Sequence, residues 1–176
     1  MTDPFEPDIS SDAADEYCLY CTIGSGVLPA KGGVHAIGPR WTLNAELQRT
    51  GRPHYILQTR RHVPDFDELN AAEASELGLI TGALVGEMKS CFGASRIAVS
   101  YLSENSPPHV HLRFIPRFDS DATNARGLGL FGAAAPVDYA GPNDVEAVTQ
   151  IAAALCARFG YEPALENDSP DSPSLD

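Results

Sequence analysis

The chain has 176 residues, which suits one domain, and 43% of them are hydrophobic, enough for a sizeable core. No stretch approaches the roughly 20 apolar residues of a membrane span, and the acidic N-terminus lacks the basic start of a secretory signal, so we expect a cytoplasmic protein with no membrane partner. Residues 1–17 hold six acids and residues 159–176 hold five, with no Lys or Arg in either, so the ends carry most of the net charge of −12, which disfavours nucleic-acid partners.

Composition divides the chain into one folded domain and two acidic tails. Residues 1–16 and 161–176 are rich in Asp, Glu, Pro and Ser, and we expect both segments to be disordered. Residues 17–160 then form the single domain.

The N-terminal half of this domain is expected to consist mainly of strands. Residues 17–24, which include Cys18 and Cys21, predict a tight knuckle. Residues 34–46 are rich in β-forming residues but are broken by a Gly-Pro step, which predicts a hairpin or two short strands. Residues 54–59 predict a further strand.

Residues 70–92 carry the clearest helical pattern in the sequence. Asn70 and Glu73 have the spacing of a capping box, and Gly93 stands where a helix would stop. Apolar residues recur at steps of three and four, which predicts one buried face: Leu77, Ile80, Leu84 and Met88.

The C-terminal half continues with strands, a loop and a helix. Residues 96–102 and 110–115 predict two strands, and residues 143–159 predict a second helix. Residues 119–141 are rich in Gly, Ala and Asp without periodicity, which predicts a long surface loop, with a lid over a binding site as one interpretation. The order of elements indicates an α+β domain with a mainly antiparallel sheet, one long helix and a C-terminal helix.

The predicted strand around residue 110 places chemically active side chains in a row. Alternate residues of a strand share one face, so His109, His111 and Arg113 would lie on one side. The residues between them would face the core: Val110, Leu112 and Phe114. Two imidazoles and a guanidinium could hold a phosphate, a metal or both. The alternative is an ordinary edge strand whose polar residues face water.

The C-x-x-C pair formed by Cys18 and Cys21 is a candidate metal site. Two thiolates on one turn offer half of a tetrahedral Cys2His2 zinc site. Spacing alone does not select the two histidines from the five in the chain: His35, His54, His62, His109 and His111. The alternative is a pair of reduced thiols without a metal.

Three segments together resemble the histidine-triad (HIT-like) superfamily, in its zinc-binding branch. Residues 109–117, HVHLRFIPR, resemble the family's alternating histidines before a Pro-Arg pair, with Arg113 in place of the third histidine. Residues 54–62, HYILQTRRH, match a family segment that precedes a turn and a long helix, although Gln58-Thr59 replaces an apolar-Pro pair. Residues 18–21, CLYC, match the start of the zinc-bearing branch.

The resemblance implies a HIT-like fold, a structural zinc ion and a nucleophile. The implied zinc ligands are Cys18, Cys21, His62 and His109. His111 matches the family's nucleophile, which attacks the α-phosphorus of a nucleotide to form a nucleotidyl-imidazole intermediate.

The resemblance also implies residues that bind the substrate. Glu46 stands where relatives place an acid that binds the ribose hydroxyls, and Asn105 and Ser106 stand where relatives contact the phosphate or leaving group. Arg113 is expected to bind phosphate. Arginine does not shuttle protons near neutral pH, so its presence argues against simple hydrolysis.

These expectations favour an enzyme, a nucleotide hydrolase or nucleotidyl transferase that acts through His111 on a nucleotide or other phosphorylated small molecule. One alternative is a catalytically inactive, zinc-stabilised module that binds a nucleotide or phosphate. Another is a structural or regulatory protein whose acidic tails carry its interactions. The resemblance further implies a homodimer.

Overall fold

The computed structural model describes residues 18–28, 33–47, 52–102, 107–134 and 145–163. The elements in chain order are α1 (Leu19–Gly24), β1 (Val34–Ile37), β2 (Trp41–Leu47), β3 (Pro53–Thr59), η2 (Phe66–Glu68), α2 (Ala71–Phe92), β4 (Arg96–Tyr101), β5 (His111–Arg117), η3 (Gly127–Gly132), α3 (Val145–Phe159) and β6 (Glu162–Pro163). None of the helices in these ranges has the length and apolar character needed to cross a membrane.

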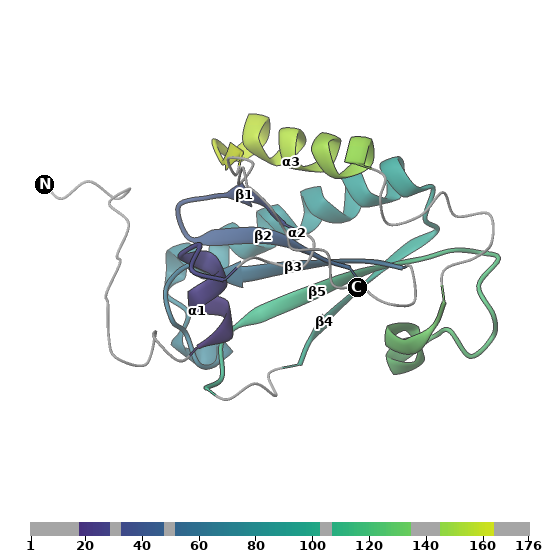
Figure 1. Cartoon of the computed structure of the whole chain (residues 1–176), viewed down its shortest axis with the longest axis horizontal. Helices are drawn as coiled ribbons and strands as arrows, with labels where there is room; N and C mark the ends of the chain where they lie inside the picture. The colour runs from purple at the N-terminus through teal and green to yellow at the C-terminus, as the bar shows by residue number, and fades with distance from the viewer. Residues whose placement is uncertain (1–17, 29–32, 48–51, 103–106, 135–144, 164–176) are drawn as a thin grey trace, which may run out of the picture.

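The strands form one six-stranded antiparallel sheet in the order β4-β5-β3-β2-β1-β6. Helices α2 and α3 lie against one face, whereas α1 and η3 lie toward the other, near opposite ends of the strands (Figure 1). The predicted α+β class with a long helix and a C-terminal helix is confirmed.

The long helix α2 begins and ends as its sequence predicts. The side chain of Asn70 accepts hydrogen bonds from the backbone of the first turn, and the carboxylate of Glu73 accepts one from the Asn70 amide, which completes the capping box. Gly93 ends the helix in a left-handed conformation, with φ of 62°. The predicted apolar face packs on the sheet, because Ile80, Leu84 and Met88 are fully buried and Leu77 is partly buried against the same core.

The main core lies between the sheet and these two helices. Val110, Leu112 and Phe114 belong to it, as the alternation of their strand predicts. The residues between them, His111 and Arg113, therefore face the other side of the sheet, where α1 packs. That second face carries the candidate chemistry.

The N-terminal segment and the predicted loop are both more regular than their sequence indicates. Within the predicted tight knuckle, residues 19–24 form a short helix, α1. Residues 119–134, the described part of the predicted loop, contain η3 and bury Ala125 and Leu130 against Ile115. Their apolar contacts fall too far apart in the sequence to give a helical or strand period.

The described fold continues for three residues beyond residue 160, where the domain is expected to end. Tyr161 is buried in the main core, and β6 pairs with β1. The strand is only two residues long, so it leaves no alternating pattern in the sequence. The two tails otherwise lie outside the described residues, as do residues 135–141 of the loop.

Gly38 allows the aromatic ring of Tyr161 to pack against the β1–β2 turn. A Cβ atom built on Gly38 would lie 2.1 Å from the ring carbon Cζ. We therefore expect Gly38→Ala to lower the free energy of unfolding by about 1 to 3 kcal/mol, measured by urea titration. Gly132→Ala is the matched control, because nothing lies within 4 Å of its Cβ position. Equal stability of the two variants would contradict the close packing.

Candidate functional site

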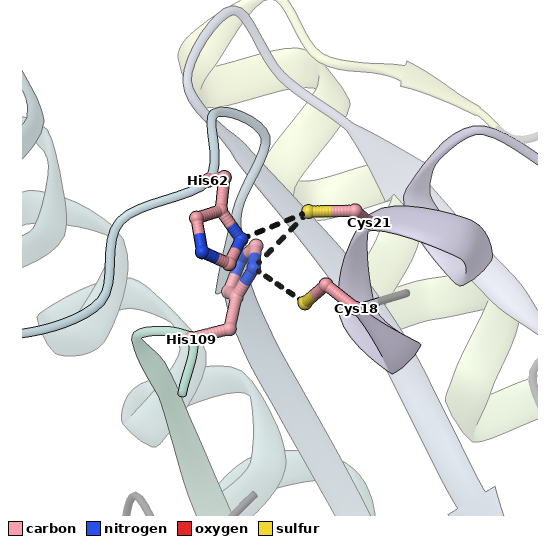
Figure 2. Close-up of side chains that lie close together, drawn as sticks. All are labelled: Cys18, Cys21, His62 and His109. Carbon is pink, nitrogen blue, oxygen red and sulfur yellow. Dashed lines mark hydrogen bonds between the residues drawn. The ribbon is translucent and has the colours of Figure 1, made fainter. Parts of the chain in front are cut away.

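Four side chains from three separate segments meet at one end of the sheet (Figure 2). Cys18 and Cys21 lie at the start of α1, His62 follows β3, and His109 precedes β5. Their potential ligand atoms all lie within 4.8 Å of one another. The structure thus brings together the four residues that the family resemblance selects from the four cysteines and five histidines of the chain.

The separations within this cluster fit a tetrahedral metal ion. Sγ of Cys18 lies 3.3 Å from Nδ1 of His109, and Sγ of Cys21 lies 3.4 Å from Nδ1 of both His62 and His109. Zinc bonds to sulfur and nitrogen place neighbouring ligand atoms about 3.3 to 3.8 Å apart. The Cys2His2 donor set and these distances fit a structural zinc ion, and four protein ligands leave no position for a reacting water.

The orientation of His109 is fixed by the backbone of β3. Its Nε2 lies 2.9 Å from the carbonyl oxygen of Thr59 and 3.0 Å from the Thr59 hydroxyl. A carbonyl only accepts, so Nε2 carries the proton and the lone pair of Nδ1 faces the two thiols. Such a hydrogen bond on the second ring nitrogen is the usual support of a metal-binding histidine.

The surroundings of Cys18 lower the pKa of its thiol. The hydrogen bond with Cys21 is the largest influence on its pKa, and burial opposes it by favouring the neutral thiol. When no metal is bound and the His109 ring carries a proton on both nitrogens, its Nδ1–H donates to the Cys18 sulfur. This bond and the positive charge of the ring act with Cys21, and together they lower the pKa of Cys18 to about 3. Because the thiolate is the form that binds metals, this environment favours coordination.

The neighbouring His111 lies outside the cluster but is joined to it through the backbone. Its Nδ1 lies 2.9 Å from the carbonyl oxygen of His109, so Nδ1 carries the proton and Nε2 carries the lone pair. The ring of Tyr20 stacks on the imidazole, with centroids 4.1 Å apart and planes inclined by 30°. Both the tautomer and the orientation of the ring are therefore defined.

The remaining predicted site residues are placed only in part. Arg113 lies two residues beyond His111 on the same face of β5 and is half-buried. Glu46 lies on β2 and pairs with His54 in the sheet, but its side chain is outside the described part of the chain. Asn105 and Ser106 fall within residues 103–106, which are also outside it.

Sequence reasoning missed a group of buried polar residues on the same face. The side-chain amide of Asn44 donates to Oε1 of Gln58 over 2.7 Å, and Nε2 of Gln58 donates to the carbonyl of Tyr20 over 2.7 Å. The signal was present, because Gln58-Thr59 departs from the apolar-Pro pair of the family pattern. The role of Gln58 cannot be predicted from this departure alone, because its partner Tyr20 lies on α1, 38 residues earlier in the chain.

Comparison with known proteins finds similar folds among solved structures but no match by sequence. No family model matches the chain, and no curated protein matches it by sequence. Among solved structures, a zinc-bound histidine triad family protein from Mycobacterium smegmatis matches with a TM-score of 0.56 at 16% identity, over 81% of this chain and 96% of the other. A HIT-like protein involved in cell-cycle regulation from Bartonella henselae gives 0.56 at 15% identity, over 82% and 100%.

A third solved structure agrees with these two. A hypothetical histidine triad nucleotide-binding protein from Sulfolobus tokodaii gives a TM-score of 0.50 at 14% identity, over 81% of this chain and 92% of the other. At such identities the likeness establishes the fold, and the chain therefore folds as the histidine triad proteins do.

Proposed function

From the histidine triad fold and the geometry around His111, we propose that this protein binds nucleotides and forms a nucleotidyl-histidine intermediate. The observation that carries the proposal is the hydrogen bond from Nδ1 of His111 to the carbonyl of His109, because it leaves the lone pair on Nε2. The nucleotide-binding description of the Sulfolobus tokodaii protein supports the ligand class. The zinc-bound Mycobacterium smegmatis protein supports a resident zinc ion.

In the proposed reaction, Nε2 of His111 attacks the α-phosphorus of the bound nucleotide. A bond forms between nitrogen and phosphorus, and the electron pair of the bond being broken departs with the leaving group, which takes a proton from solvent. The Nδ1 proton stays hydrogen-bonded to the carbonyl of His109, which stabilises the imidazolium. Water or another hydroxyl then attacks phosphorus and gives its proton to solvent, while the nitrogen–phosphorus bond breaks and its electron pair returns to Nε2 as the nucleotide is released.

The neighbouring residues have supporting roles in this proposal. Arg113 binds the phosphate, and its permanent charge stabilises the negative charge of the transition state. Glu46 binds the ribose, and Asn105 and Ser106 contact the phosphate or leaving group. The zinc ion would be held by Cys18, Cys21, His62 and His109, where it stabilises the fold.

A second candidate is a binding module that does not turn over. Two observations favour it: Arg113 stands where the family pattern has a third histidine, and residue His111 is only 1% exposed. An arginine does not relay protons, so the step that consumes the intermediate loses one potential acid or base. Under this candidate the site binds a nucleotide without covalent chemistry.

A labelling experiment tests the proposal. The zinc-loaded protein is incubated briefly with nucleoside phosphoramidates, dinucleoside polyphosphates and sugar nucleotides, and its mass is measured. We expect an adduct with the mass of one nucleotidyl group in the wild type. His111→Ala should lose the adduct completely, because it removes the attacking nitrogen, and should still bind the ligand in equilibrium titration.

The outcomes separate the two candidates. An adduct that maps to His111 and disappears in His111→Ala supports the enzyme. Binding of nucleotides by the wild type without adduct or turnover supports the binding module. An adduct that persists in His111→Ala would show that another residue is the nucleophile.

A further inference from the structure

The dipeptide Gln58-Thr59 at the end of β3 is polar and fully buried. Each residue is 0% exposed, so neither side chain can form its hydrogen bonds with bulk water. Burying an amide or hydroxyl without a partner costs about 1 to 3 kcal/mol, so such groups persist where specific hydrogen bonds hold them. Two of their partners, Tyr20 and His109, also contact His111.

Gln58 acts on the aromatic ring that covers His111. Its amide accepts a hydrogen bond from Asn44 and donates one to the carbonyl of Tyr20, both over 2.7 Å. The backbone of α1 packs closely over it, since a Cβ on Gly24 would lie 3.1 Å from Nε2 of Gln58. The amide is therefore held at both ends, and it fixes the part of α1 from which the Tyr20 ring stacks on His111.

Thr59 contacts His109, the residue whose backbone carbonyl accepts a hydrogen bond from His111. Its amide donates to the carbonyl of Val110 over 3.2 Å, a bond that a proline at this position could not make. Its carbonyl and hydroxyl oxygens both lie near Nε2 of His109, at 2.9 and 3.0 Å. The carbonyl of His109 in turn accepts the hydrogen bond from Nδ1 of His111.

We propose that Gln58 and Thr59 are positioning residues for His111. Gln58 sets the ring plane through Tyr20, and Thr59 holds the side chain of His109, the residue whose backbone carbonyl fixes the tautomer of His111. The sheet register supports this arrangement, because Gln58 lies directly opposite His111 in the pairing of β3 with β5. The inference rests on the proposed nucleophilic role of His111 and adds how the chain aims the Nε2 lone pair.

The test compares Gln58→Met with the wild type, both loaded with zinc. Methionine keeps the length of the side chain but removes both hydrogen bonds. We expect the rate constant for adduct formation at saturating adenosine 5′-phosphoramidate to fall about 10- to 100-fold, the effect of misplacing a reacting group by about 1 Å. The dissociation constant should change by less than about threefold, because the ligand contacts are intact.

A matched control separates positioning from general destabilisation. Tyr161→Phe also removes a buried hydrogen bond, the one from the Tyr161 hydroxyl to Glu76 over 2.8 Å, but it acts at the far side of the core. It should leave the labelling rate unchanged. If Gln58→Met does not fold, Thr59→Val replaces it, since valine removes the hydroxyl and keeps both backbone contacts of residue 59.

A second readout does not depend on labelling. The Nδ1 proton of His111, assigned in NMR spectra by its absence from His111→Ala, should exchange slowly with solvent in the wild type and at least about tenfold faster in Gln58→Met. An unchanged exchange rate together with an unchanged labelling rate would overturn the inference. Faster exchange in a protein whose wild type forms no adduct would support the positioning role while refuting the proposed function.

Discussion

Replacing Cys18 by serine is expected to lower the free energy of unfolding by about 5 kcal/mol or more and to reduce bound zinc to well below one ion per chain. A structural zinc ion contributes about 10 to 16 kcal/mol of apparent free energy in small zinc-binding peptides. This domain also has a large apolar core, so it should lose only part of that amount. For a chain of this size the melting temperature should fall by about 10 to 20 °C.

The other two cysteines provide matched controls. Cys91 and Cys156 lie on α2 and α3, away from the cluster, and Cys91→Ser and Cys156→Ser should retain zinc and melt close to the wild type. A strong chelator should bring the melting temperature of the wild type down to that of Cys18→Ser. A Cys18→Ser protein that retained one zinc ion and melted like the wild type would show that Cys18 is not a ligand.

The sequence predicts part of the metal cluster, and the rest depends on the family resemblance and on how the strands pair. The C-x-x-C spacing alone indicates half of a site, and five histidines remain as candidates for the other half. The family resemblance selects His62 and His109, and the structure places these two beside the cysteines. The choice depends on which strands are neighbours, because β3 and β5 pair in the sheet although they lie about 50 residues apart, as the contact between Thr59 and His109 shows.

Local patterns predict the elements whose signals lie within one segment. Two local signals predict α2: the capping box of Asn70 and Glu73, and the apolar period of residues 70–92. The structure contains both the helix, at Ala71–Phe92, and its capping box. The strand β6 gives no such signal, because two residues cannot show alternation. Its pairing with β1 depends on Tyr161 packing against Gly38, a contact between positions far apart in the chain.

The described part of the loop after β5 is held by an arginine that no motif indicates. Arg52 is fully buried, and its guanidinium donates to both carboxylate oxygens of Asp121, at 2.6 and 3.1 Å. It also donates to the carbonyl oxygens of Pro116, Ala133 and Ala134. One side chain thus joins the segment before β3, the end of β5 and both ends of residues 121–134. The sequence separation of 69 residues between the paired charges hides the contact from local analysis.

Arg52→Met is expected to lower the free energy of unfolding by about 3 to 5 kcal/mol, because it leaves the Asp121 carboxylate buried without its cation. Asp121→Leu should cost a similar amount. The double variant should be more stable than the sum of the two losses predicts, by about 2 to 3 kcal/mol, when urea unfolding is measured for all four proteins. Additive losses would contradict a direct coupling between the two charges.

An exposed ion pair gives the control for this cycle. A guanidinium nitrogen of Arg158 on α3 lies 3.9 Å from a carboxylate oxygen of Glu87 on α2, and the Arg158 side chain is 60% exposed. Water screens such a pair, so Arg158→Met should change stability by less than about 1 kcal/mol. The contrast between the two arginines would show that the effect of Arg52 comes from burial of the pair and not from loss of a positive charge.

The same ion pair predicts how stability depends on pH. Burial raises the pKa of Asp121, but hydrogen bonds from Arg52 and the Phe118 amide, with the charges of Arg52 and Arg117, outweigh burial and lower it overall. Because the folded pKa lies below the unfolded value of about 3.9, the stabilisation is present above about pH 4 and is lost as pH falls through the folded pKa. Urea titrations between pH 7 and pH 3 should therefore show a steeper loss of stability in the wild type than in Asp121→Asn, since asparagine does not titrate. Parallel curves for the two proteins would mean that ionisation of Asp121 does not contribute to the free energy of unfolding.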